Sequence, residues 1–326
     1  MSMILNQQLT GPSAWAGRDL AQEESWIHHL DDSAISELES ALENAKNSAL
    51  ATEDLTAADF PLSRFSVQLR DFAEELENGR GFLLLRGLPV ERYSDEDIRT
   101  IYYGIGLHLG SPVRQNPKGD LLGLVMHVGD VNDKQTRVFE TNLYLPYHTD
   151  PSDVVGLLCL RKAKTGGMSS LVSSASVYNE IVRQYPEFLA LFYRPLYYAH
   201  LGKNVPGLSP IFSFNEGKLS CRYLRQYIEL GHEMMNLPLS RIEVEALNIF
   251  DSIMQDENLR LDMMLQPGDL QFANNYMVMH SRTEFEDYEA LQMRRKMLRL
   301  WLKMPNARQL AVDFPGRNGF PAAVVI

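Results

Sequence analysis

Apolar residues recur at helical spacing in the first third of the chain. Ile35, Leu38 and Leu42 lie three or four positions apart, and the polar stretch 31–33 ahead of them supplies an N-cap, so the pattern predicts a helix over residues 33–47. The same spacing predicts further helices over residues 65–79, from Ser94 to about 105, over 176–193 with a break at Pro186, and over 240–254.

Shorter apolar runs separated by turn residues predict strands in the rest of the chain. Residues 81–86 indicate a buried strand, residues 266–269 a turn, and residues 297–304 a strand with alternating faces. A strand-rich body flanked by helices fits a double-stranded β-helix, the jelly-roll form that cupins share. We therefore expect a mainly β fold with flanking helices as one structural unit. Residues 1–80 would form a helical N-terminal segment packed on the core, and residues 81–326 the double-stranded β-helix with helical insertions.

The short triplet His148-Thr149-Asp150 is the most informative candidate site. Alternate residues of a strand point to the same face, so His148 and Asp150 can bind one ion together. A third ligand must come from elsewhere, and His280 is the leading candidate. Two imidazoles and one carboxylate on one face of an octahedron are typical of non-haem Fe(II) oxygenases, because three coordination positions stay open. A His-x-Asp pair alone is common, so the segment after His280 matters.

Arginines alternate with apolar residues in that later segment. If residues 297–304 form a strand, Arg295 and Arg299 face the same way. Burying both would be costly unless anions meet them. The planar guanidinium suits a carboxylate, and 2-oxoglutarate is a dicarboxylate that can chelate iron at one end and pair with an arginine at the other. The alternative is that both arginines pair with internal aspartates or glutamates.

Five ordered segments together resemble the taurine/2,4-dichlorophenoxyacetate dioxygenase family of Fe(II)/2-oxoglutarate enzymes. The segments span roughly residues 80–305 and are Tyr147-His-Thr-Asp, Gly166-Gly167-Met168-Ser169, Pro267 to Asn275, His280-Ser281-Arg282 and Arg294-Arg295-x3-Arg299-x-Trp301. The resemblance implies that the iron ligands are His148, Asp150 and His280. It also implies that O2 and 2-oxoglutarate are co-substrates, with release of succinate and CO2.

The resemblance also assigns the co-substrate contacts. Arg295 would hold the distal carboxylate of 2-oxoglutarate, and the Ser169 hydroxyl would support that carboxylate in place of the family's frequent threonine. Arg299 would lie near the iron-bound carboxylate or reach an acidic group on the substrate. An acidic insertion after His280 leaves two candidates for the clamp, and strand phasing with Arg299 favours Arg295 over Arg294.

The substrate pocket is less sharply marked. Relatives line the pocket with residues at the positions of Asn142, Tyr144, Gln115 and Asn116, and His127 is a further candidate. Alternatively, Gln115 and Asn116 satisfy loop backbone and Tyr144 belongs to the core. An arginine beside the iron favours a small substrate with a carboxylate, sulfonate or amino-acid group.

The retained carboxylate of Asp150 bears on the reaction. Halogenating relatives carry a small residue there, so hydroxylation, desaturation or ring closure at an unactivated C–H bond is the better interpretation. Two other classes stay open on the residues alone, a non-catalytic jelly-roll binder and a metal-dependent hydrolase using zinc at the same triad.

Composition narrows the partners. Lys and Arg number 31 against 42 Asp and Glu in 326 residues, a net charge of −11, which argues against nucleic acid or an anionic membrane as the partner. The partner we expect is a small molecule, and a homo-oligomer stays open. Two cysteines without metal spacing, no leader-like start and no transmembrane-length stretch predict a cytoplasmic protein.

Overall fold

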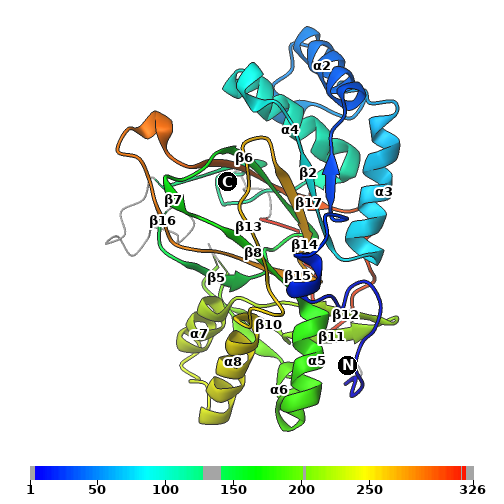
Figure 1. Ribbon diagram of the computed structural model, residues 1–326. Helices are drawn as coiled ribbons and strands as arrows, with labels where there is room; N and C mark the ends of the chain where they lie inside the picture. Colours follow the sequence, from blue (N-terminus) through cyan, green and yellow to red (C-terminus); the bar gives the residue numbers. More distant parts are fainter. Residues whose placement is uncertain (1–3, 128–140, 201–202, 317, 321–326) are drawn as a thin grey trace.

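Two β-sheets face each other in the computed structural model, which describes residues 4–127, 141–200, 203–316 and 318–320 (Figure 1). The larger sheet has the order β1-β2-β14-β6-β17-β3, and β4 also pairs with β17. Its strands are β1 (Ile27–His29), β2 (Phe82–Arg86), β3 (Ser111–Pro112), β4 (Leu122–Met126), β6 (Val154–Arg161), β14 (Leu270–Asn274) and β17 (Lys296–Lys303). The smaller sheet has the order β13-β8-β15-β5. Its strands are β13 (Leu261–Met263), β8 (Ser169–Ser173), β15 (Val278–Arg282) and β5 (Leu145–His148).

Apolar side chains from both sheets meet between them. Phe82 and Val155 of the larger sheet and Leu171 and Val278 of the smaller one belong to a single buried cluster. Alternation along each strand sends these residues inward and their neighbours to the opposite face. The expected double-stranded β-helix with flanking helices is therefore confirmed.

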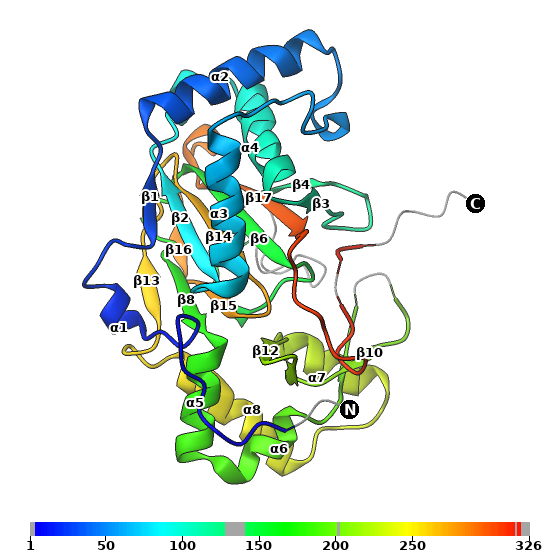
Figure 2. The same cartoon turned by 90° about the vertical axis from the view of Figure 1, so that its right-hand side faces the viewer.

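Helices cover the outer faces in two groups (Figure 2). The first group lies along the larger sheet and shares its outer apolar cluster: α2 (Asp32–Asn47), α3 (Phe65–Asn78) and α4 (Asp95–Leu109). The second group gathers at the other end of the molecule: α5 (Ser174–Gln184), α6 (Leu189–Phe192), α7 (Arg225–Met234) and α8 (Arg241–Met254). The remaining short elements are α1 (Gly17–Leu20), the 3-10 turns Thr52–Asp54, Val90–Arg92, Pro186–Phe188 and Leu291–Met293, and the paired strands β7 (Thr165–Gly166) with β16 (Phe285–Glu286), β9 (Leu196–Tyr198) with β10 (Gly207–Ser209), and β11 (Phe212–Asn215) with β12 (Lys218–Cys221).

Local signals in the sequence match the helix ends. The Asp31 side chain accepts the Ala34 N–H at 2.8 Å, and Ser240 with Glu243 forms the capping box that opens α8. No strand is predicted at the position of β1. β1 pairs in parallel with β2, so the segment expected to be helical also extends the larger sheet across the predicted boundary at residue 80. That boundary itself stays a prediction.

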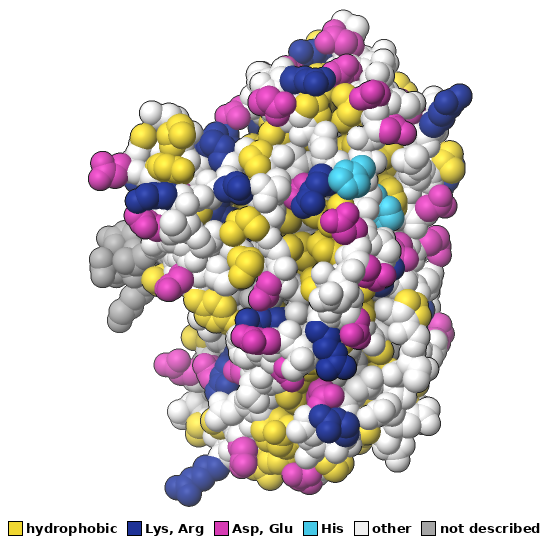
Figure 3. All heavy atoms as spheres, in the orientation of Figure 1, with side chains coloured by type: hydrophobic (Ala, Val, Ile, Leu, Met, Phe, Trp, Pro, Cys, Tyr) yellow, Lys and Arg dark blue, Asp and Glu magenta, His cyan; other side chains and the backbone are white. Residues whose placement is uncertain are grey.

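Both signs of charge occur on the exposed face of the molecule that Figure 3 draws, where acidic and basic side chains are interspersed. No helix in the described ranges combines the length and the apolar character needed to cross a membrane.

Candidate metal centre

The small sheet brings both candidate histidines to neighbouring positions. β15 runs antiparallel to β5, and His280 is the direct cross-strand partner of His148. Asp150 follows two residues after His148, just beyond the end of β5. The two histidines are therefore neighbours on adjacent strands, and Asp150 joins them from the same face of the chain as His148. This is the arrangement that the sequence predicted.

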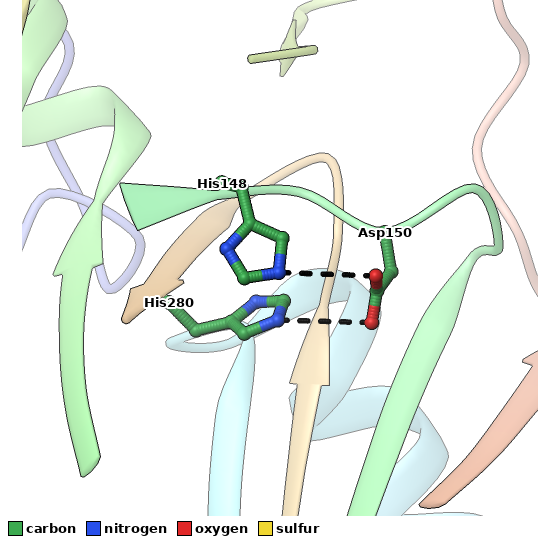
Figure 4. Close-up of side chains that lie close together, drawn as sticks. All are labelled: His148, Asp150 and His280. Atoms are coloured by element: carbon green, nitrogen blue, oxygen red, sulfur yellow. Dashed lines mark ion pairs between the residues drawn. The ribbon is translucent and has the colours of Figure 1, made fainter. Parts of the chain in front are cut away.

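The three side chains point toward one another (Figure 4). His148 Nε2 lies 3.9 Å from Asp150 Oδ1, and His280 Nε2 lies 3.7 Å from Asp150 Oδ2. One ligand atom from each residue falls within 4.8 Å of the others, and all three residues are buried. This donor set fits Fe(II) as a facial triad.

Hydrogen bonds fix the orientation of the ligands. His148 Nδ1 lies 2.8 Å from the Pro146 carbonyl oxygen, which accepts its proton and leaves Nε2 for the metal. The Asp150 N–H donates to Asn275 Oδ1 at 2.9 Å, and Trp301 Nε1 donates to Asp150 Oδ2 at 2.9 Å. Asp150 is thus held from both its backbone and its carboxylate.

The protonation states also suit a metal. Burial, together with the neighbouring His148, lowers the pKa of His280 to about 3, so the imidazole is neutral near pH 7. Burial raises the pKa of Asp150, but Arg299, the two histidines and the Trp301 hydrogen bond outweigh it and hold that pKa below its usual value. Within the described part of the chain, His280 Nδ1 is buried without a hydrogen-bond partner.

Arg299 lies on β17 beside this triad. Its Nε donates to Gln115 Oε1 at 2.8 Å, and its guanidinium lies 4.6 Å from the Trp301 ring centroid. Gln115 in turn donates to the Arg299 carbonyl at 2.7 Å, so one side chain holds Arg299 at two points. Gly123 makes room for this contact, because a Cβ there would lie 2.6 Å from Gln115 Oε1. Gln115 therefore satisfies backbone carbonyls, as the alternative from the sequence expected, and its role in binding substrate stays a prediction.

Arg294 and Arg295 differ in their burial and in their hydrogen bonds. Arg294 is partly exposed and donates to the carbonyls of His127, Tyr288 and Glu289. Arg295 is 5% exposed, and none of the described residues accepts a hydrogen bond from its guanidinium. Its Nε would lie 3.3 Å from a Cβ on Gly167, so a glycine at that position leaves room for Arg295.

Arg282 is a buried arginine near Arg295 to which the sequence analysis gives no role. It lies two positions after His280 on β15 and is the cross-strand partner of Ser169 on β8. Its guanidinium donates to the Thr141 and Leu143 carbonyls, while its buried Nε has no partner among the described residues. Burial and the nearby Arg295 lower the pKa of Arg282 to about 9. The alternation rule that joined His148 to Asp150 could have found it.

Both Arg282 and Arg295 lie over the ring of Phe285. The guanidinium carbons of Arg282 and Arg295 lie 4.6 and 5.4 Å from its ring centroid. Ser169 is buried nearby, but its hydroxyl donates to Gln271 Oε1 at 3.0 Å.

Two of the other predicted substrate residues contact Phe285, whereas Tyr144 lies at the surface. Asn142 donates to the Phe285 carbonyl at 3.1 Å, and the His127 ring packs edge-on against Phe285 at 6.3 Å. Tyr144 is 39% exposed, and its hydroxyl accepts from Gln255. Tyr144 is therefore not a core residue, contrary to the alternative considered from the sequence.

Asn116 has a local role. Its amide donates to Asp120 Oδ2 at 2.7 Å, and its carbonyl oxygen accepts the N–H groups of Gly119 and Asp120. These contacts close its own turn, as the alternative considered from the sequence expected. Its substrate role stays a prediction without a contact to support it.

A model of the family described as Taurine catabolism dioxygenase TauD, TfdA family matches residues 47–301. The chain belongs to this family. It is accordingly an Fe(II)/2-oxoglutarate-dependent dioxygenase, with Fe(II) as its metal and 2-oxoglutarate as its co-substrate. Membership in the TauD, TfdA family removes the non-catalytic binder and the zinc hydrolase from consideration.

Two similar proteins carry names that indicate different activities. The chain is 33% identical over 319 residues to FR-33289 synthase of Streptomyces rubellomurinus, covering 95% of this chain and 94% of the relative. It is 27% identical over 308 residues to the taurine hydroxylase-like protein SAT17 of Stachybotrys chartarum, covering 90% and 79%.

Solved structures agree on the fold. Asparagine oxygenase in complex with Fe(II), 2S,3S-3-hydroxyasparagine and succinate superposes with a TM-score of 0.67 at 18% identity, covering 85% of this chain and 93% of that one. The non-heme iron oxygenase OrfP in complex with Fe superposes with a TM-score of 0.63 at 14% identity, covering 89% and 99%.

Proposed function

We propose that this TauD, TfdA family enzyme oxidises an unactivated C–H bond of a small anionic or amino-acid-like substrate, with hydroxylation as the outcome. The observation that carries the proposal is Arg299. It is 9% exposed, it is held in place by Gln115, and its charge acts on both Asp150 and His280. A buried cation this close to a metal centre favours an anionic group on the molecule that binds there.

Arg295 is the residue we assign to the distal carboxylate of 2-oxoglutarate. The Arg295 guanidinium is buried and donates to none of the described residues, whereas Arg294 donates to three backbone carbonyls. Arg282 adds a second positive charge beside it. We propose that the pair receives one carboxylate, which would offset their mutual repulsion.

Ser169 takes a lesser part in this proposal. A serine hydroxyl has one proton, and here it is donated to Gln271. The hydroxyl would have to turn to reach a carboxylate, so the arginines would provide most of the binding energy.

When bound, Fe(II) supplies oxygen activation coupled to decarboxylation of 2-oxoglutarate to succinate and CO2. The protein's own residues set the geometry for that chemistry. Trp301 and Asn275 keep the Asp150 carboxylate turned toward the two histidines. Arg299, held in position by Gln115, would bind the substrate's anionic group and so fix the C–H bond that faces the metal. With Fe(II) bound, the carboxylate of Asp150 would serve as a ligand and would leave no place for a halide there.

The named ligands of two structural relatives support an amino-acid-like substrate. One structure holds hydroxyasparagine, and OrfP has been solved in complex with L-Arg. Each of these ligands carries an α-carboxylate, the kind of group that Arg299 would bind.

The test begins with anaerobic addition of Fe(II) and then 2-oxoglutarate to the apo-protein, followed by the visible charge-transfer band of the chelate. Small acids, amino acids and matched neutral amides are then screened for a shift of that band and for succinate formation. We expect acids to shift the band and their amides not to. A preferred substrate that carries no carboxylate or other anionic group would refute the assignment of Arg299.

A further inference from the structure

Arg222 is a further buried arginine, next in the chain to a residue that contacts the metal-ligand loop, and nothing described so far uses it. It follows β12 and is 2% exposed. In the described part of the chain no aspartate or glutamate pairs with it, and its Nε is buried without a hydrogen-bond partner. Burial lowers the pKa of Arg222, and the groups that oppose this are the hydroxyls of Tyr198 and Tyr276. An unpaired buried guanidinium is costly, so its retention calls for an anion.

Backbone contacts place Arg222 next to the ligand segment. The Thr149 N–H donates to the carbonyl of Tyr223 at 2.8 Å, and the Tyr223 N–H donates to Thr149 Oγ1 at 3.2 Å. Thr149 stands between the ligands His148 and Asp150. The residue after Arg222 is therefore tied directly to the loop that carries the iron ligands.

Two residues of the β9–β10 segment, Tyr198 and His200, contact the guanidinium. Tyr198 covers one face of it, with the guanidinium carbon 4.2 Å from the ring centroid, and its hydroxyl donates to the Arg222 carbonyl at 2.7 Å. His200 Nε2 lies 3.5 Å from Arg222 Nη2. Gly207, the cross-strand partner of Tyr198, leaves room for this histidine, because a Cβ there would lie 2.9 Å from His200 Nε2. The hairpin thus positions an aromatic face and an imidazole around one cation.

We propose that Arg222 binds a second anionic group of the substrate, separate from the one assigned to Arg299. The substrate would then be a small molecule with two oxyanion groups, such as a dicarboxylic amino acid or a carboxylate that also carries a sulfonate or phosphonate. The aromatic face of Tyr198 orients the guanidinium, and the N–H edge of the guanidinium donates to the oxyanion. This inference rests on the proposed function for the identity of the ligand as a substrate.

Sulfate serves as the probe of the anion site. Full-length protein is loaded anaerobically with Fe(II) and 2-oxoglutarate, so that the site at Arg295 is filled, and is titrated with sulfate against chloride at constant ionic strength while thermal unfolding is followed. We expect a saturable rise in Tm whose midpoint weakens at least about tenfold in Arg222→Met, the loss of one charge-assisted contact. An equal midpoint in Arg222→Met, or no saturable rise in the wild type, would overturn the proposal.

Two further variants separate binding from structure. Arg225 lies three residues away and is paired with Glu229 and Asp251, so Arg225→Met should keep the sulfate response. Arg222→Lys keeps the charge without the fork and should respond at an intermediate concentration. Without added anion, Arg222→Met should unfold at the wild-type temperature or above it, because an unpaired buried charge has been removed. A clear drop in Tm would show a structural role and overturn the proposal.

Turnover distinguishes this inference from the proposed function. Succinate formation is compared for diacids and for the matched monoacids. We expect the wild type to prefer diacids and Arg222→Met to lose that preference. Turnover of monoacids and diacids alike would reject the role of Arg222 and leave the proposed function standing. Absence of 2-oxoglutarate consumption with any acid would instead count against the proposed function, while the sulfate titration would still decide whether Arg222 binds an anion.

Discussion

Arginines in two regions of the molecule meet very different partners. Away from the metal centre, Arg86 donates two hydrogen bonds to the buried Asp269 at 2.9 and 2.8 Å. Arg308 donates to Glu77 at 3.0 Å, a carboxylate that Lys218 and Asn274 also contact. Each of these cations has its countercharge built into the fold.

Around the metal centre the countercharge is lacking. Arg222, Arg282 and Arg295 are each about as buried as Arg308, yet within the described residues none forms an ion pair with a carboxylate. Asp287 acts on Arg282 and Arg295 only at longer range. A paired buried arginine is part of the architecture, whereas an unpaired one marks a place where a ligand completes the charge balance.

The largest effect should come from removing a metal ligand. We expect His280→Ala to lose Fe(II) and with it all succinate formation, because no other described residue can replace the ligand facing His148. Iron content after anaerobic loading and succinate yield measure this. The exposed His29 on β1 supplies a control, and His29→Ala should keep both. Retained turnover in His280→Ala would disprove the ligand assignment.

Breaking the buried ion pair between Glu77 and Arg308 should lower the stability of the fold and leave the catalytic activity unchanged. Glu77→Gln removes the carboxylate that faces Arg308 and should destabilise the fold by about 3 kcal/mol, because a buried charge loses its partner. Urea unfolding measures the loss, and activity per folded molecule should stay unchanged. If Glu77→Gln unfolds at the wild-type urea concentration while Arg222→Met is strongly destabilised, the contrast between the two regions is wrong.

Arg295→Ala tests one of the buried arginines that form no ion pair with a carboxylate among the described residues. We expect the KM for 2-oxoglutarate to rise by about 30- to 150-fold, since a charge-assisted pair contributes about 2–3 kcal/mol. Arg294→Ala is the matched control, because its guanidinium donates to backbone carbonyls and should leave that KM unchanged. The reverse result would move the clamp to Arg294.

Trp301→Phe sharpens the comparison at the metal itself. The change keeps an aromatic ring beside Arg299 but removes the hydrogen bond to Asp150 Oδ2. Loss of such an outer contact should weaken Fe(II) binding about tenfold, measured by competition with a chelator. Trp26 donates to backbone carbonyls near β1, so Trp26→Phe should leave the iron affinity unchanged. Equal iron affinities in the two variants would show that the Trp301 contact is structural only.

The predictions from sequence succeeded where a local period decides the outcome. The two-residue spacing brought His148 and Asp150 together, although Asp150 lies just beyond the end of β5. The phase of Arg295 with Arg299 stays a prediction, because Arg295 precedes β17 and the strand register shifts between Lys296 and Met297. The predictions failed where long-range packing decides. β1 is three residues long and gains its place by pairing with β2, which no local pattern records.

The surroundings of Arg222 show the same limit. Tyr198, His200 and Thr149 are brought to it by the β9–β10 hairpin and by a loop contact, and their spacing in the sequence gives no sign of this. That an arginine lacks a buried carboxylate can be seen only once the whole fold is assembled. Charge compensation is therefore a structural signal of function that sequence patterns do not carry.

The smallest expected effect tests how far the carboxylate site depends on neutral donors. Ser169→Ala removes a hydroxyl that donates to Gln271, so the KM for 2-oxoglutarate should rise only about two- to fivefold, the value of one neutral hydrogen bond. Ser169→Thr keeps the hydroxyl and should restore the wild-type KM. A rise in Ser169→Ala as large as that in Arg295→Ala would mean that the hydroxyl turns to the carboxylate when 2-oxoglutarate binds. Binding at this site would then depend on a neutral donor as much as on the unpaired arginines.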